Sequence, residues 1–554
     1  MRITAIEIEN FKGIADRVRV ELKPITLLFG ANSAGKSTIL HALLYLRDVL
    51  ERRNLDAITT PASGAALDLG GFRRFVHRQE LERPIKIRVD MEVTGEELPV
   101  MAPGREFVGA FSKISGGIQD LFDQSRTQIL QSVLSASVEI EVRWDELVQS
   151  PIAFAYTVGL NGADFCRYER DIDTFKVAKL DLVNSSVDWP FTKEDFGTVL
   201  AYVQNPDSFQ GAGDDQAQLV RNLYMWLRFI GTPGQTGLTT WLPNPKDPIP
   251  DFAYHEVLHL PAVDWEGLNC WDKLDSDRDC MEIANSWAWD GTAFLARLII
   301  GPGRLVRDWL RDLRYIGPLR ARPPREGIPS VELGDWAEGL AAWKTLEQAS
   351  PELLTEVGNW LSSKDHLNSG YGLTRQRRVE LDADALDQVL AGRPTKTQLR
   401  ALLRNASERT QINLLETRSG LELAPSEVGV GLSQVLPVVI AALDSPNGLV
   451  SIEQPELHIH PAMQVALGDL FIEGALNRGT QFLIETHSEH LILRLMRRIR
   501  ENHISPEAVS VMFVMPKAQG IKFKELHIDE DGDFIDDWPG GFFEESFHEK
   551  FAGR

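Results

Sequence analysis

The sequence predicts an α/β fold with a mixed sheet, an antiparallel β lobe and a large helical or irregular insertion. An apolar run at residues 25–29 leads into a glycine-rich loop and then into an apolar helix at residues 39–46. Two more short apolar runs, at residues 449–452 and 482–484, are typical of strands buried on both faces of a parallel sheet. Alternating apolar and polar segments predict the antiparallel lobe, and they cover residues 85–93, 136–144, 152–160 and 177–184.

The composition limits the class of protein. The chain has 554 residues, of which 43% are apolar and 25% charged, as is ordinary for a globular protein of several domains. We expect a cytoplasmic protein without membrane contact, because no apolar stretch is long enough to cross a bilayer and the first residues do not resemble a signal peptide. The three cysteines show no CxxC spacing and predict neither disulfides nor zinc.

The net charge of −22 argues against a broad surface for nucleic acid, so any such contact is expected to be local. Basic residues gather in two places, one around Arg494 and Arg498 and the other around Arg320 and Arg322. We interpret the first group as a solvated helix face and the second as a structural loop.

The first strands are predicted from alternation. Ile6 and Ile8 alternate with glutamates, and residues 18–22 follow the same pattern, which suits two strands joined by a turn at Lys12 and Gly13. Ile3 falls out of this phase, so we expect the first strand to be covered on both faces near its start.

The loop after residue 29 matches G-x-x-x-x-G-K-[ST] completely, through Gly30, Gly35, Lys36 and Ser37. The glycines allow a tight turn whose N–H groups point at phosphates, and Lys36 is expected to neutralise the β and γ phosphates. Ser37 is expected to bind Mg²⁺. The sequence therefore predicts binding of ATP and Mg²⁺ by seven residues: Asn32, Ser33, Ala34, Gly35, Lys36, Ser37 and Thr38.

A second half of the site is expected at the ends of the two later buried strands, because hydrolysis also needs an acidic residue for Mg²⁺ and a group that positions water. Glu453 ends the first of these strands, and Thr486, His487 and Ser488 follow the second. Between the loop and these strands, a glycine-rich turn places Ser433 just ahead of an apolar helix, which is an anion-binding arrangement.

Taken in order, these elements resemble the ABC-type P-loop ATPase head, and more closely the OLD-like branch related to RecF and SMC proteins. The opening string IENFKGI resembles the first strand of that family. The string YIGPLRARPPRE at residues 315–326 and the terminal residues Trp538, Pro539, Phe542 and Phe543 resemble a group of prokaryotic OLD-like ATPases. The resemblance covers about half of the chain.

The resemblance implies a homodimer, or a higher homo-oligomer, in which two heads close on two ATP molecules. Ser433 would then contact the γ-phosphate held by the other subunit. Glu453 would hold Mg²⁺ through water, and His487 would be the switch histidine.

The sequence departs from the family at Gln454, where the commoner pattern has the glutamate that acts as catalytic base. A glutamine cannot take a proton as a carboxylate can. Three alternatives stay open: Gln454 orients water and hydrolysis is slow, Glu456 or another residue is the base, or the glutamine was engineered to trap ATP. A separate metal site at His458 and His460 is not favoured, because no third ligand stands at metal spacing.

The predicted domains are an N-terminal ATPase lobe at residues 1–190, a mainly helical insertion at 191–400 and a C-terminal ATPase lobe at 401–554. Too few residues follow His487 for the Toprim nuclease domain of OLD proteins. Relatives with this layout resemble the ATPase subunits of Septu, PARIS and retron systems. They imply a sensor, scaffold or regulator of a separate effector, a nuclease or toxin, in bacterial antiphage defence. The alternatives are a RecF/SMC-like ATPase of DNA repair or recombination and an autonomous nuclease.

Overall fold

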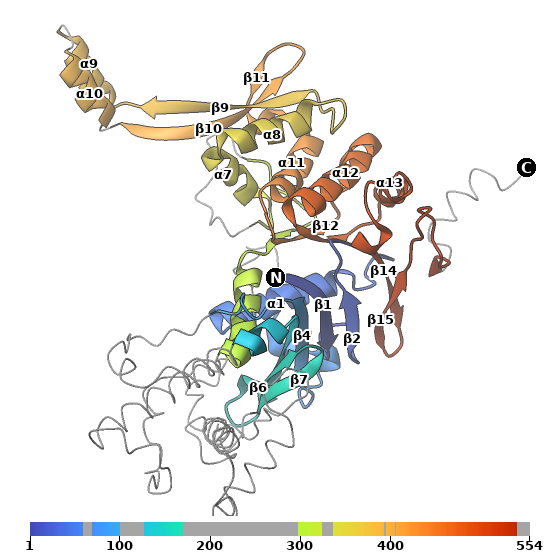
Figure 1. Cartoon of the computed structure of the whole chain (residues 1–554). Helices are drawn as coiled ribbons and strands as arrows, with labels where there is room; N and C mark the ends of the chain where they lie inside the picture. Colours follow the sequence, from blue (N-terminus) through green and yellow to red (C-terminus); the bar gives the residue numbers. More distant parts are fainter. Residues whose placement is uncertain are drawn as a thin grey trace, which may run out of the picture. The chain divides into compact units, whose positions relative to one another are not determined.

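The structure is a computed structural model that describes residues 1–58, 69–99, 127–169, 297–323, 336–392, 395–404 and 406–539 (Figure 1). The chain divides into two compact units. Unit 1 comprises Met1–Glu21, Tyr45–Ile58 and Gly70–Arg311, and unit 2 comprises Leu22–Leu44, Thr59–Leu69 and Asp312–Arg554. The predicted division at residues 190 and 400 stays a prediction, and most of the expected insertion lies outside the described residues. No helix within the described ranges is long and apolar enough to cross a bilayer.

Unit 1 contains an antiparallel six-stranded sheet with the order β2-β1-β4-β5-β6-β7. Its strands are β1 (Arg2–Glu9), β2 (Val18–Glu21), β4 (Ile85–Glu92), β5 (Ser135–Asp145), β6 (Ser150–Leu160) and β7 (Ala163–Glu169). Three of the four alternating segments form β4, β5 and β6, and the fourth lies outside the described residues. Strand β7 was not predicted because its sequence does not alternate. Phe165 and Cys166 are both buried although they are consecutive, and they lie next to a register shift in the pairing of β7 with β6.

The adjacent residues Ala5 and Ile6 are both fully buried, as the expected cover on two faces requires, and the phase of Ile3 also has a local cause. The pairing of β1 with β4 shifts register between Ile3 and Ala5, which marks a β-bulge. An extra residue at the bulge moves the side chains that follow it to the other face. Ile3 and Ile6 are therefore both buried although they are an odd number of residues apart.

Unit 2 contains the sheet that positions the predicted site. Its order is β15-β14-β3-β13-β12-β8, with β15 antiparallel and the other strands parallel. The strands are β3 (Ile25–Gly30), β8 (Arg314–Ile316), β12 (Leu449–Glu453), β13 (Gln481–Glu485), β14 (Val509–Lys517) and β15 (Gly520–Leu526). Every residue of β3, β12 and β13 is buried, as their apolar runs predict.

Helices pack on this sheet through one apolar cluster that includes Trp343, Leu436 and Phe471. They are α7 (Leu340–Gln348), α8 (Pro351–Ser362), α11 (Val430–Leu443), α12 (Pro461–Arg478) and α13 (Glu489–Arg500), with the 3₁₀ turns Pro425–Glu427 and Pro506–Ala508. Figure 1 shows α11, α12 and α13 in succession above β12. Two basic residues of α13 form ion pairs within unit 2, since Arg494 and Arg498 both donate hydrogen bonds to the Asp469 carboxylate of α12.

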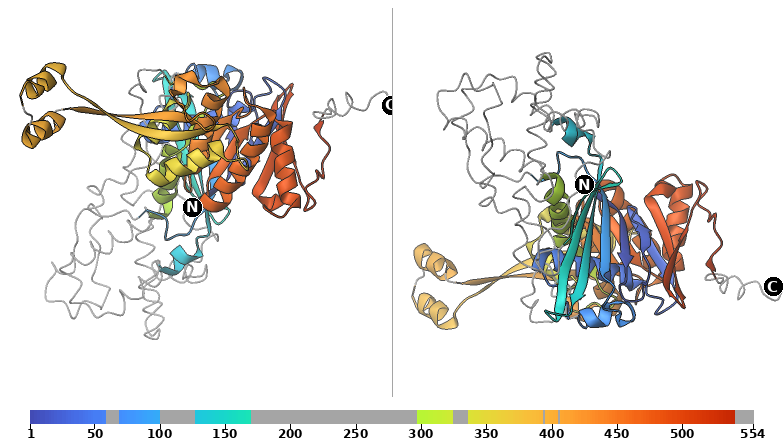
Figure 2. Two further views of the ribbon diagram at one scale, coloured as in Figure 1. Left: turned by 90° about the horizontal axis from the view of Figure 1, so that it is seen from above. Right: turned by 90° about the horizontal axis from the view of Figure 1, so that it is seen from below.

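A separate three-stranded sheet extends from unit 2, with β9 (Tyr371–Glu380) and β10 (Ser407–Glu416) as a long hairpin beside β11 (Glu422–Leu423). Figure 2 shows that the far end of this hairpin carries α9 (Ala383–Leu390) and α10 (Lys396–Arg404). Helix α1 (Ser37–Arg52) begins in unit 2 and ends in unit 1, where α2 (Phe72–Phe75) and the 3₁₀ turn His77–Gln79 also lie.

The terminal motif packs on the central strand. The ring of Trp538 meets Phe29 of β3 edge to face at 5.3 Å and Phe513 of β14 at 6.0 Å. Trp538 thus covers the strand that leads into the glycine-rich loop, whereas Phe542 and Phe543 lie outside the described residues. The predicted α/β fold, with a mixed sheet and an antiparallel β lobe, is confirmed.

The substitution Gly30→Ala tests how closely the end of β3 packs against β14. Gly30 has φ 148°, and a Cβ there would lie 2.6 Å from the carbonyl oxygen of Val514 on β14. We expect Gly30→Ala to lower the free energy of unfolding by about 2–4 kcal/mol, because strain and overlap with backbone add. Gly370→Ala is the control, since φ is 81° but nothing lies within 4 Å, and it should cost about 1 kcal/mol. Equal losses in urea unfolding would contradict this account.

Candidate nucleotide-binding and catalytic site

The glycine-rich loop connects β3 to α1 as the motif requires. Ser33 and Gly35 have positive φ angles of 61° and 93°, and a Cβ on Gly35 would lie 2.1 Å from Cδ1 of Ile521. Alternation of such angles turns successive N–H groups toward one point, which makes an anion-binding concavity. Asn32 and Ser33 are exposed, whereas Ala34 and Thr38 are buried. The seven predicted loop residues therefore lie in one turn at the start of α1.

Lys36 is folded back into this loop, with 3% of its surface exposed. Its Nζ donates to the carbonyl oxygens of Gly30 at 3.2 Å and Ala31 at 3.0 Å, and it lies 3.6 Å from Glu485 Oε1. These oxygen contacts stabilise the buried side chain, which could exchange the two carbonyl oxygens for phosphate oxygens.

Two carboxylates meet opposite Ser37. The parallel pairing of β12 with β13 sets Glu453 directly beside Glu485, and both side chains are almost fully buried. The Ser37 hydroxyl donates to Glu485 Oε2 at 2.5 Å. Glu453 Oε1 accepts a hydrogen bond from the Tyr315 hydroxyl at 2.8 Å and lies 3.6 Å from His41 Nε2.

The two carboxylates differ in pKa. Burial by itself opposes ionisation of Glu453, but hydrogen bonds from His41, Tyr315 and Ser37 bring its pKa below the usual value. Burial raises the pKa of Glu485, and the charge of Glu453 adds to this rise, although Ser37 and Lys36 counteract it. Glu453 and Glu485 thus form an acidic pair, and a cation bound beside them would be stabilised.

These residues fit a magnesium ion. Mg²⁺ prefers hard oxygen ligands, keeps several waters and takes one or two carboxylates together with substrate phosphates. Ser37, Glu453 and Glu485 supply a hydroxyl and two carboxylates beside the phosphate-binding loop. Ser37 and Glu453 were predicted for this role, whereas Glu485 was missed. Its signal was the acidic residue that ends the second apolar run, as Glu453 ends the first.

The turns after β12 and β13 hold the other predicted groups. Gln454 has φ 46°, and its N–H donates to the carbonyl oxygen of Glu485 at 2.7 Å. Glu456 accepts from the Thr486 hydroxyl at 2.8 Å and from the His487 N–H at 2.7 Å, so both of its oxygens bind the neighbouring turn. Burial, followed by the charge of Lys36, lowers the pKa of His487. The structure thus places Gln454, Glu456 and His487 around one turn pair beside Lys36.

His458 and His460 have structural positions in the loop after β12. His458 is exposed with φ 62°. His460 begins α12, where its Nδ1 accepts a hydrogen bond from Ala462 N at 3.1 Å.

The placement of Ser433 differs from the prediction. Ser433 lies within the first turns of α11 and not ahead of the helix, it is fully buried, and its hydroxyl has no hydrogen-bond partner within the described residues. Helical phase thus turns the Ser433 side chain toward the core, and its contact with a second subunit stays a prediction. The exposed residues at this helix N-terminus are 429 and 430.

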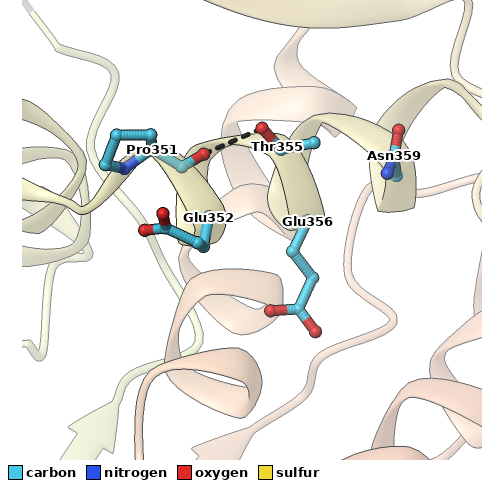
Figure 3. A pocket seen from close by; sticks show the side chains of 5 residues that line it. All are labelled: Pro351, Glu352, Thr355, Glu356 and Asn359. Atoms are coloured by element: carbon cyan, nitrogen blue, oxygen red, sulfur yellow. Dashed lines mark hydrogen bonds between the residues drawn. The ribbon is translucent and has the colours of Figure 1, made fainter.

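A pocket in unit 2 lies elsewhere, along α8 (Figure 3). Glu352 and Glu356 point to the same side of the helix, while Thr355 bonds the Pro351 carbonyl. Glu356 also pairs with Arg478. None of the predicted nucleotide-binding residues lines this pocket.

Two segments of the chain are similar to families of ATPase domains. Residues 326–494 match a family described as "AAA domain, putative AbiEii toxin, Type IV TA system", and residues 1–91 match the family "AAA ATPase domain". No curated protein matches the chain. The chain is thus similar to AAA ATPase domains over both segments, which supports ATPase activity. The finer resemblance to OLD-like proteins stays a prediction.

Among solved structures, similar chains include an SMC head bound to the C-winged helix domain of ScpA, with TM-score 0.36 and 10% identity, covering 96% of this chain and 99% of that one. The SMC head domain from Thermotoga maritima has TM-score 0.34 and 9% identity, covering 95% of this chain and 100% of that one. The functional assignment rests on the site itself and on the two family matches.

The acidic pair predicts a pH-dependent effect of Glu485→Gln. A carboxyl whose pKa is raised by folding contributes most stability below its unfolded pKa and loses that contribution as the pH rises through the folded pKa. Glu485→Gln removes the buried charge, and an amide can still accept from Ser37. Without nucleotide and metal, the variant should gain stability relative to wild type between pH 4.5 and 7.5.

Denaturant unfolding at both pH values measures this gain. The exposed Glu507 provides the control, since Glu507→Gln should change stability by a similar amount at both pH values. The prediction would be contradicted if the difference in stability between Glu485→Gln and wild type were the same at pH 4.5 and pH 7.5.

Proposed function

We propose that this chain is an ATPase that binds Mg²⁺·ATP at residues 30–38 and completes its site with the N-terminus of α11 from a second copy. The observation that carries the proposal is the meeting of Lys36 and Ser37 with Glu453 and Glu485 at the carboxyl ends of three adjacent parallel strands. Ligands of open α/β sheets bind at this edge of the strands. The two ATPase-domain matches support the same activity.

Each group then has a role. The loop N–H groups and Lys36 bind the phosphates, while Ser37, Glu453 and Glu485 hold the metal directly or through water. Bound Mg²⁺ supplies neutralisation of charge on the β and γ phosphates. Gln454 orients water by hydrogen bonding. Burial and the charge of Lys36 lower the pKa of His487, which favours the neutral imidazole, and His487 would face the γ-phosphate.

The second copy would contribute backbone donors. Residues 429–430 are exposed at the start of α11, and the partial positive charge of a helix N-terminus favours phosphate. This proposal moves the predicted contact from the Ser433 hydroxyl to these backbone groups. ATP would then join two heads, and hydrolysis would release them.

We further propose that the ATPase regulates a separate effector in bacterial defence. The family description matched by residues 326–494 names a putative toxin system, which supports this direction. Infection of cells carrying this gene and its neighbours tests it, with Lys36→Ala as the inactive control. Equal phage titres with wild type and Lys36→Ala would oppose a defence role and leave the ATPase assignment untouched.

Lys36→Ala tests nucleotide binding. Loss of a buried ammonium that faces phosphate should weaken ATP binding by about 2–4 kcal/mol, or roughly thirty- to several-hundredfold in Kd. Lys344→Ala is a matched control, because Lys344 pairs with Glu347 on α7. Titration with a fluorescent ATP analogue measures both affinities, and equal affinities would overturn the assignment of the loop.

Gln454→Glu tests the water-positioning role. If residue 454 contacts the attacking water, a carboxylate there should raise kcat by about 10- to 100-fold, since general bases contribute about 10²–10⁴-fold. Gln398→Glu on α10 is the control, and phosphate release is the measurement. An unchanged kcat with unchanged ATP affinity would place the base elsewhere.

A further inference from the structure

The segment at residues 315–320, which we call the brace loop, reaches the candidate site with both ends. Tyr315 belongs to β8, and the pairing of β8 with β12 aligns it with Ser451, two residues before Glu453. Its hydroxyl donates to the Glu453 carboxylate at 2.8 Å. The first residue of the brace loop is thus hydrogen-bonded to Glu453, a proposed metal ligand.

The other end is Arg320, whose guanidinium is buried with 4% of the residue exposed. Its Nη2 donates to the carbonyl oxygen of Glu453 at 2.7 Å and to that of Gln454 at 3.4 Å, and its Nη1 donates to that of Gln434 at 3.3 Å. Burial lowers the pKa of Arg320 to about 10, so the group is still charged at neutral pH. One cation therefore spans the end of β12 and the first turns of α11.

Gln434 of α11 strengthens the connection between α11 and Arg320 through two side-chain hydrogen bonds. Its Oε1 accepts from the Arg320 N–H at 3.2 Å, and its Nε2 donates to the Arg320 carbonyl at 2.6 Å. The brace loop is also tied to the segment before α7, where Gly317 N bonds Ala337 O and Ala321 N bonds Glu338 O. These bonds leave Arg320 little freedom to move independently of α11.

Retention of a cation here has a physical cost. Burying a charge costs several kcal/mol, and an apolar residue often replaces a buried ionic group without loss of stability. Gln454 also holds a left-handed backbone conformation that is uncommon outside glycine. Both features are explained if the guanidinium sets the position of the 453–454 backbone.

We propose that Arg320 is a positioning residue that couples the N-terminal turn of α11 to Glu453 and Gln454. This inference rests on the proposed function. When the exposed start of α11 engages phosphate held by a second copy, a small shift of α11 moves Gln434 and Arg320 together. The carbonyls at residues 453 and 454 follow, and with them the water-positioning side chain.

The test compares Arg320→Lys and Gln434→Met with a matched control, Arg314→Lys. Lysine keeps the charge at residue 320 but cannot span three carbonyls, and methionine keeps the volume at residue 434 but loses both amide bonds. Arg314 lies on β8 as well, where it pairs with Asp444 and stacks on Trp336. The readouts are ATP affinity, kcat and KM, ATP-driven association in sedimentation, and hydrogen exchange of the 453–457 amides.

Both test variants should bind ATP within about threefold of wild type, and kcat should fall by about tenfold or more at unchanged KM, as for an interaction used only in the transition state. ATP should protect the 453–457 amides in wild type and Arg314→Lys but not in the test variants. The double variant should lose no more than either single one, because both substitutions break one connection.

Unchanged kcat and ATP-induced protection in both test variants would overturn the inference. The inference would also be overturned if kcat, ATP affinity and melting temperature fell in parallel in both test variants. That result would indicate a purely structural role. Failure of the wild type to bind ATP would instead refute the proposed function. The wild-type titration therefore separates the two failures.

Discussion

The parallel pairing of β3 with β13 and β14 is the constraint on which unit 2 depends. It brings residues 25–30 between two strands from the last part of the chain, and it joins Ser37 to Glu485 across 448 residues of sequence. The glycine-rich loop, the acidic pair and the His487 turn all leave from the carboxyl ends of neighbouring strands as a result. Packing of Ile521 against Gly35 and of Trp538 against Phe29 supports the same strand from the C-terminal hairpin and its tail.

The strands and site residues that could be predicted from the sequence are those whose local pattern has a single physical explanation. The runs at β3, β12 and β13 are mostly apolar because both faces are covered, and the conformation of the loop at residues 30–38 depends on its glycines. Glu485 also ends an apolar run, but only the pairing of β12 with β13 shows that it lies beside Glu453. Ser433 was assigned to the surface because its helical phase depends on where α11 begins, and that start is residue 430. Tyr315 and Arg320 were noted in a motif, but their partners are more than 100 residues away.

The charges in the site also offer a reason for glutamine at residue 454. Glu453 and Glu485 already place two carboxylates side by side, with Lys36 near only one of them. A third carboxylate in the next position would add repulsion in a region where water screens little. An amide keeps the ability to hydrogen-bond water without that charge. The two carboxylates would thus favour a bound cation, as the proposed metal site requires.

The wide sequence separation within the central sheet has a consequence for biosynthesis. Ribosomes release the N-terminus first at roughly 5–20 residues per second, so β3 waits on the order of half a minute or more for β13 and β14. During that time its two apolar faces and its unpaired edges need other cover, which makes the nascent chain a client for chaperones. The glycine-rich loop therefore leaves the ribosome long before the two strands that flank β3. ATP binding then reports that the translated chain has folded through β14.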